Sequence, residues 1–71
     1  MNEDDYIKII GKNIVSRRKE LGIKQIDLAT MIGIEDSSLR RIESGRTNPT
    51  FKTLYRIAEA LNVEIVDLVK K

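Results

Sequence analysis

Apolar residues recur every three or four positions along most of the chain, which is the spacing of amphipathic α-helices. The first such stretch predicts a helix from about Asp4 to Leu21. Its apolar stripe consists of Ile7, Ile10, Ile14, Val15 and Leu21. The acidic residues Asp4 and Asp5 favour the start of a helix, and Gly22 favours its end.

Two shorter helices are predicted next, separated by a tight turn. The first covers Gln25 to Ile32, and the second covers Asp36 to Ser44. Gly33 suits the positive φ that ends a helix, and Gly45 stops the second helix. Ala29 is small and sits where two helices can cross closely. Together these elements predict a helix-turn-helix.

The second of these two helices has one apolar face and one polar face. Leu39 and Ile42 lie three residues apart and share a face. At roughly 100° per residue, the outward positions are Ser37, Arg40, Arg41 and Ser44. A helix that is anchored by two apolar residues and presents hydroxyls and guanidiniums suits a polar or anionic partner. The helix-turn-helix reader of the DNA major groove has this design.

Two further helices complete the predicted fold. The fourth runs from about Phe51 to Leu61, with Thr50 as its N-cap and Asn62 as a left-handed C-cap. Its apolar positions are Phe51, Leu54, Ile57, Ala58 and Leu61. The fifth is short, from about Ile65 to Val69, and its β-branched residues could suggest a strand, which would have no partner. We therefore predict an all-α fold, a compact bundle of five short helices.

Composition restricts the possible functions. With 71 residues, the chain is expected to form one domain over residues 1–71, near the size at which a single core is marginally stable. It has no cysteine for a disulfide or thiolate metal site, and no histidine, the commonest general base. No spacing indicates a catalytic pair, so we expect neither an enzyme nor a cofactor. The lack of a long apolar run predicts a cytoplasmic protein without a transmembrane helix.

The distribution of charge is more informative than its sum. The formal net charge is only +2, but three of the 11 acidic residues lie in a short N-terminal extension, residues 1–5. The remainder has 13 basic residues against 8 acidic ones. Local basic clusters are Arg17, Arg18 and Lys19, and Arg40, Arg41 and Arg46. From composition alone, a nucleic-acid interface and ordinary solvated charge explain these clusters equally well.

With its motif residues assembled, the chain resembles the Cro/repressor type of helix-turn-helix domain, also called the XRE family. The matching positions are Gln25, Leu28, Ala29, Gly33, Ile34, Leu39, Ile42, Glu43, Gly45, Pro49, Phe51 and Leu54, followed by Ile57, Ala58, Ala60, Leu61, Asn62 and Val63. The resemblance covers about Gly11 to Leu68, with the motif core at residues 25–46. It implies a lambda-repressor-like DNA-binding domain in a small stand-alone regulator, such as a restriction-modification controller.

The resemblance also implies which residues contact DNA. The family's reading positions correspond here to Asp36, Ser37, Ser38 and Arg41, and an arginine can bond bidentately to guanine. Contacts to the DNA backbone would come from Lys24, Gln25, Arg40, Ser44, Arg46, Thr47 and Asn48. In the family, the glutamine at position 25 also braces the reading helix, and an internal ion pair corresponds to Arg18 and Glu43. The alternative is that the arginines are exposed surface charges paired with Ser37 or a nearby acid.

Two acidic residues at the start of the reading helix depart from the family pattern. Glu35 stands where the family often has a serine N-cap, and Asp36 stands where it often has an amide or a basic residue. Asp36 could accept a hydrogen bond from cytosine N4. We favour a structural role, in which Asp36 pairs with Arg40 one turn later and its negative charge stabilises the helix N-terminus. Lys24 replaces another serine cap, which removes roughly 1 kcal/mol of stabilisation.

Members of this family usually bind as two-fold dimers to pseudo-palindromes whose half-sites lie about 34 Å apart. We expect a homodimer on double-stranded DNA, with interface candidates Tyr55, Val63, Ile65, Val66 and Val69, although most of these could instead fill the core. The predicted function is sequence-specific transcriptional regulation, as a repressor or autoregulator. The alternative, favoured by Glu35, Asp36 and the modest net charge, is a protein-interaction module or antitoxin-type partner with weak or no DNA binding.

Overall fold

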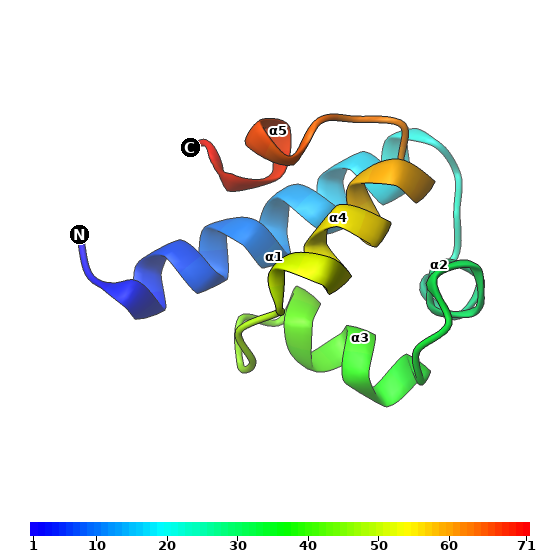
Figure 1. Ribbon diagram of the computed structural model, residues 1–71, viewed down its shortest axis with the longest axis horizontal. Helices are drawn as coiled ribbons and strands as arrows, with labels where there is room; N and C mark the ends of the chain where they lie inside the picture. The colour runs from blue at the N-terminus through cyan, green and yellow to red at the C-terminus, as the bar shows by residue number, and fades with distance from the viewer.

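The computed structural model describes residues 1–71 as an all-α fold (Figure 1). Its helices are α1 (Glu3–Glu20), α2 (Gln25–Ile32), α3 (Asp36–Glu43), α4 (Phe51–Ala60) and α5 (Ile65–Val69). The five predicted helices are therefore confirmed, and α2 and α5 have the predicted bounds. The other three helices each end one residue earlier than predicted, because Leu21, Ser44 and Leu61 are C-cap residues. None of the five combines the length and hydrophobicity that crossing a membrane requires.

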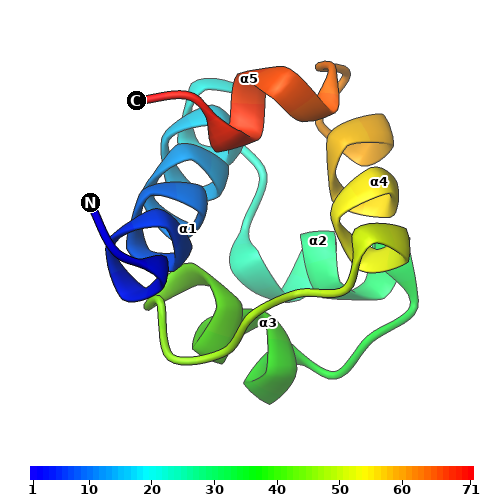
Figure 2. The same cartoon turned by 60° about the vertical axis from the view of Figure 1, so that its left-hand side comes forward.

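The helices pack as a ring around one core (Figure 2). The long helix α1 contacts α3 on one side and α5 on the other, α2 packs between α3 and α4, and α4 closes the ring against α5. The helix-turn-helix pair, α2 and α3, consequently lies at the opposite edge of the molecule from α5 (Figure 1). This arrangement leaves the outer side of α3 free of other helices.

Each helix contributes one fully buried side chain to the centre of this ring. These residues are Ile14 of α1, Leu28 of α2, Leu39 of α3, Ile57 of α4 and Leu68 of α5. Burying a side chain of this size stabilises the fold by about 1.5–3 kcal/mol relative to leaving it exposed. Ala29 is 2% exposed, as its predicted place at a close helix crossing requires.

The prediction was wrong for two residues of the apolar stripes, which do not lie in the core. Leu21 is 42% exposed and Phe51 is 72% exposed. Leu21 follows the last residue of α1, so the helical periodicity that placed it on the stripe no longer applies. Phe51 is the first residue of α4, and because side chains tilt toward the helix N-terminus it projects past the packed part of that helix.

The predicted helix ends have their expected local causes. Gly33 and Asn62 both adopt positive φ, at 73° and 57°, and so end α2 and α4 in the left-handed conformation. Thr50 caps α4 by accepting a hydrogen bond from the Thr53 N–H at 3.1 Å. Lys24 and Glu35 make no side-chain cap, as their residue types predict. Both helices of the motif therefore depend on packing for their start.

Polar side chains of α1 hold the C-terminal part of the chain. The Asn13 Nδ2 group donates to the backbone oxygens of Leu68 at 2.9 Å and Lys70 at 2.7 Å. The Arg17 Nε group donates to the Leu61 oxygen at 3.0 Å. The carbonyls at the ends of α4 and α5 have no partner within their own helix, so these side chains satisfy them. They fix α4 and α5 on α1.

Helix α1 meets the reading helix α3 backbone to backbone at Gly11. A Cβ atom at this position would lie 2.7 Å from the Ile42 carbonyl oxygen, and closer still to the carbonyl oxygen of Glu43. Gly11 is buried, so only a residue without a side chain permits this approach. The contact sets the distance between α1 and α3.

We expect Gly11→Ala to lower the free energy of unfolding by about 1–3 kcal/mol, because the added methyl group forces α1 away from α3. Urea unfolding followed by circular dichroism measures this change. Lys12→Ala, an exposed position on the same helix, is the matched control and should lie within about 0.5 kcal/mol of the wild type. A stabilised Gly11→Ala protein, as helix propensity alone predicts, would contradict the close approach.

Candidate nucleic-acid interface

The outer face of α3 is polar and open to solvent. Leu39 and Ile42 point inward and are buried, as their spacing predicts. The side chains of Asp36, Arg40 and Arg41 are exposed, whereas Ser37 and Ser38 are half-buried. The helix thus presents a guanidinium-bearing surface that is fixed from behind by two apolar residues.

Beside this face lies a hollow of about 670 Å³ that no apolar residue lines. Its lining residues are Gln25, Ser37, Arg40, Arg41, Glu43, Ser44 and Arg46. They come from the start of α2, from α3 and from the loop that follows it. The structure therefore brings together Ser37 and Arg41, which were predicted to contact bases, with four of the residues predicted to contact the DNA backbone. Asp36, Ser38, Lys24, Thr47 and Asn48 do not line it.

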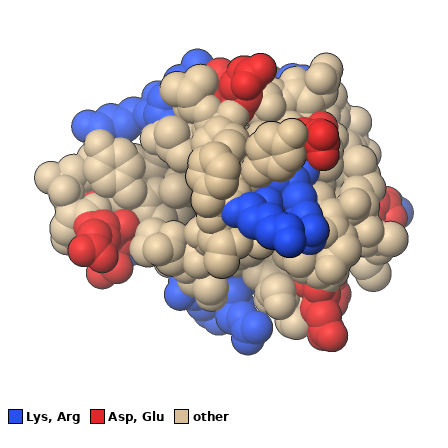
Figure 3. All heavy atoms as spheres, in the orientation of Figure 1, with Lys and Arg blue, Asp and Glu red and all other residues tan.

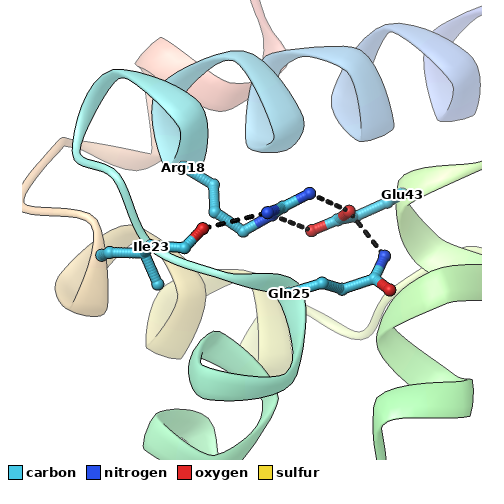
Figure 4. A network of polar contacts seen from close by, with 4 residues as sticks. All are labelled: Arg18, Ile23, Gln25 and Glu43. Carbon is cyan, nitrogen blue, oxygen red and sulfur yellow. Dashed lines mark hydrogen bonds and ion pairs between the residues drawn. The ribbon is translucent and has the colours of Figure 1, made fainter.

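A buried ionic network, drawn in Figure 4, adjoins this hollow through Gln25 and Glu43, which line it. The Arg18 Nε and Nη2 groups donate to the two carboxylate oxygens of Glu43 at 2.9 and 3.1 Å. The Arg18 Nη1 group donates to the Ile23 carbonyl at 3.0 Å. Only 12% of the Arg18 side chain and 4% of the Glu43 side chain are exposed. The pair joins α1 to the end of α3.

Gln25 belongs to the same network. Its Nε2 group donates to a Glu43 carboxylate oxygen at 2.8 Å, which ties the first residue of α2 to the last residue of α3. One N–H of the amide and its oxygen remain available on the side of the hollow. The family resemblance supplied the bracing role of Gln25, but the partner could not be read from the sequence, because Glu43 lies 18 residues away.

The two acidic residues at the start of α3 behave as local helix features. An Asp36 oxygen lies 3.8 Å from Arg40 Nη2, and the two side chains are 49% and 61% exposed. The pairing that we favoured over a cytosine contact is therefore present. An exposed pair of this kind contributes only about 0–1 kcal/mol, so a phosphate can displace it. Asp36 does not prevent Arg40 from binding an anion.

Charge is divided along the length of α3. In Figure 3, the lower edge of the molecule carries acidic atoms toward the start of this helix and basic atoms toward its end. Arg40 and Arg41 lie in the last turn of α3, and Arg46 lies in the loop just beyond it. The basic surface is thus concentrated at one end of the motif, next to Gln25 and Ser44.

A family model described as Helix-turn-helix matches residues 14–68. The chain belongs to the Cro/repressor-type helix-turn-helix family. It is 40% identical over 65 residues to the uncharacterized HTH-type transcriptional regulator y4dJ of Sinorhizobium fredii, which covers 92% of this chain and 84% of that protein.

Solved structures support the same assignment. The restriction-modification controller protein C.AhdI from Aeromonas hydrophila matches with a TM-score of 0.84 at 26% identity, covering 87% of this chain and 94% of that one. The biofilm regulator SinR, solved in complex with DNA, matches with a TM-score of 0.80 at 34% identity, covering 86% and 98%. This helix-turn-helix protein is accordingly a DNA-binding transcriptional regulator from a non-enzymatic family.

The buried Arg18–Glu43 pair should contribute strongly to the free energy of unfolding. We expect Glu43→Gln to cost about 3–5 kcal/mol of unfolding free energy, because it leaves the buried Arg18 charge without its counter-charge. Chemical denaturation measures the loss. Asp36→Asn, which breaks an exposed ion pair, is the control and should cost less than about 1 kcal/mol. Similar losses in the two variants would show that burial of the Glu43 pair has no energetic consequence.

Proposed function

We propose that this regulator binds a pseudo-palindromic operator as a homodimer, with α3 of each protomer in the major groove, and represses transcription from that site. The observation that carries this proposal is the polar hollow next to α3. It groups Arg41 and Arg46 with Gln25 and Ser44 on one rigid surface. Donors of this kind position a protein on phosphates while the groove-facing residues read base edges.

The base-reading role falls on the first and outward positions of α3. Arg41 is exposed and makes none of the four ion pairs, so its guanidinium is free to bond guanine O6 and N7. Ser37, which lines the hollow, and Ser38 can donate to or accept from several bases. Asp36 would accept from cytosine N4 through the carboxylate oxygen that is not paired with Arg40. Arg41 therefore contributes the most selective of these contacts.

The DNA backbone would be held by two groups of residues. Lys24 and Gln25 at the start of α2 form one group, and the other consists of Arg40 of α3 with Ser44, Arg46, Thr47 and Asn48 after it. Ser44 Oγ donates to the Arg41 carbonyl at 3.2 Å, so its hydroxyl would have to rotate away from that carbonyl to donate to a phosphate, whereas Arg46, Thr47 and Asn48 are exposed. Because Gln25 and α3 are joined through Glu43, both sets of contacts move as one body.

The dimer interface is proposed on the surface between α4 and α5. Tyr55 and Val66 are 53% and 60% exposed, and both line an apolar hollow of about 430 Å³ that also includes Val63 and Ile65. Val63, Ile65 and Val69 are partly buried against the protein's own core, so they would add less new contact area. Such a dimer would have to place its two α3 helices about 34 Å apart, which is the spacing of half-sites on DNA.

DNA binding is tested by fluorescence anisotropy with the DNA immediately upstream of the protein's own coding region and a scrambled fragment. We expect tight binding to the upstream fragment that weakens steeply with salt, because bound phosphates release counterions. Arg41→Ala should weaken the free energy of binding to the upstream fragment by about 1–3 kcal/mol and leave binding to the scrambled fragment unchanged. Arg56→Ala removes an exposed arginine of α4 that lies outside the hollow and is the matched control.

The same titration separates the two candidate functions. A protein-interaction module would bind both DNAs equally weakly, even at low salt, and a search for a protein partner would replace the operator hypothesis. Equal losses on both fragments in Arg41→Ala would instead assign Arg41 to a phosphate rather than to a base.

Dimerisation is tested by sedimentation equilibrium of the wild type and of Tyr55→Glu and Val66→Glu. We expect each substitution to raise the Kd of the dimer at least tenfold, because two symmetry-related carboxylates would face each other across a two-fold interface. Met31→Glu, at an apolar position of α2 that is 56% exposed, is the control and should not change the association. A wild type that stays monomeric at every concentration, on and off DNA, would contradict the proposed dimer.

A further inference from the structure

The N-terminal half of α1 lies against the end of the reading helix through Lys8. A Cβ atom built on Gly45 would lie 2.7 Å from Lys8 Cγ, 3.0 Å from its Cα and 3.3 Å from its Cβ. The aliphatic stem of Lys8 therefore covers Gly45, the residue that follows the C-cap of α3. Gly45 also has a φ of 77°, so both its conformation and the lysine exclude a side chain there.

This packing places a positive charge beside the reading surface. Gly45 separates Ser44 from Arg46, and both of these residues line the hollow next to α3. Lys8 remains exposed overall although its stem is packed on Gly45, as is usual for a lysine that covers a surface with its stem and keeps its charge in water. It makes none of the four ion pairs, and neither Asp4 nor Asp5, one turn earlier, is paired with it.

The position of Lys8 is fixed by the neighbouring helix contact. Gly11, three residues later on the same face of α1, touches the carbonyl oxygens at the end of α3. This close approach sets where the first half of α1 lies relative to the end of α3. The lysine stem is thus held over the α3–α4 loop before any DNA is bound.

We propose that Lys8 is a further DNA-backbone contact, which extends the interface from α2 and α3 onto α1. The inference rests on the proposed DNA-reading function. A lysine ammonium acts as a point charge on a flexible stem, so it would neutralise a phosphate without selecting a base. The phosphate would lie beside those bound by Ser44 and Arg46, on the side of α3 away from the acidic residues at its start.

Lys8→Met tests this role, since methionine keeps an unbranched stem over Gly45 and removes the charge. Anisotropy titrations over a range of salt concentrations would use the upstream fragment and the scrambled one. We expect a several-fold weaker Kd at low salt, equal on both DNAs, and a slope of log Kd against log salt that is smaller by about one. Lys8→Arg should restore the wild-type slope.

Lys71→Met is the matched control, because it removes the same charge from the chain end near α5, at the opposite edge from α3 (Figure 1). Its slope should equal that of the wild type. Equal slopes in Lys8→Met and the wild type, or the same reduction in both methionine variants, would overturn the Lys8 contact alone. A wild type without salt-dependent binding to either DNA would overturn the DNA-reading proposal, and the Lys8 contact with it.

Discussion

A carboxylate buried at the end of the reading helix sets the geometry of the whole motif. Glu43 is 8% exposed, and removing such a charge from water is costly unless it is paired and hydrogen-bonded. Arg18 supplies two parallel hydrogen bonds from α1, and Gln25 supplies a third from α2. Three helices therefore meet at one charged group. A shift of any of them would leave part of that charge unsatisfied, so α3 has one favoured position.

That constraint compensates for the weakness of α3 as an isolated helix. It has eight residues, and Glu35 provides no side-chain cap. Helices of this length are unstable alone in water, because the free-energy cost of nucleation exceeds the stabilisation that so few hydrogen bonds provide. Leu39 and Ile42 hold its inner face, Gly11 lets α1 touch its backbone, and Glu43 anchors its end. The polar outer face is consequently presented without needing any stabilising contact of its own.

Periodicity and cap residues were sufficient to predict the helices, because those signals are local. Gly33 and Asn62 ended α2 and α4 for the conformational reason expected of them. The errors at Leu21 and Phe51 arose at helix ends, which a repeat in one segment cannot reveal: α1 ends before Leu21, and Phe51 projects past the packed part of α4. Asn13 reaches carbonyls 55 and 57 residues away, so its role was invisible in the sequence. The clustering of Gln25 with Arg41 and Arg46 in one hollow likewise required the fold, although the family motif had named these residues separately.

The division of charge along α3 bears on the proposed dimer. Asp36 and Glu35 stabilise the start of the helix through its dipole but repel phosphates there. In the proposed interface, most of the attraction to DNA would come from the basic residues at the end of α3 and in its loop, with Lys24 and Lys8 beside them, in a chain with a net charge of only +2. Each phosphate contact contributes a salt-dependent increment, and a single protomer offers few of them. Linking two such surfaces makes the second binding event effectively intramolecular, which raises affinity without any new basic residue. In the proposed dimer, selectivity would come from half-site spacing as well as from base contacts, because only correctly spaced sites would engage both protomers.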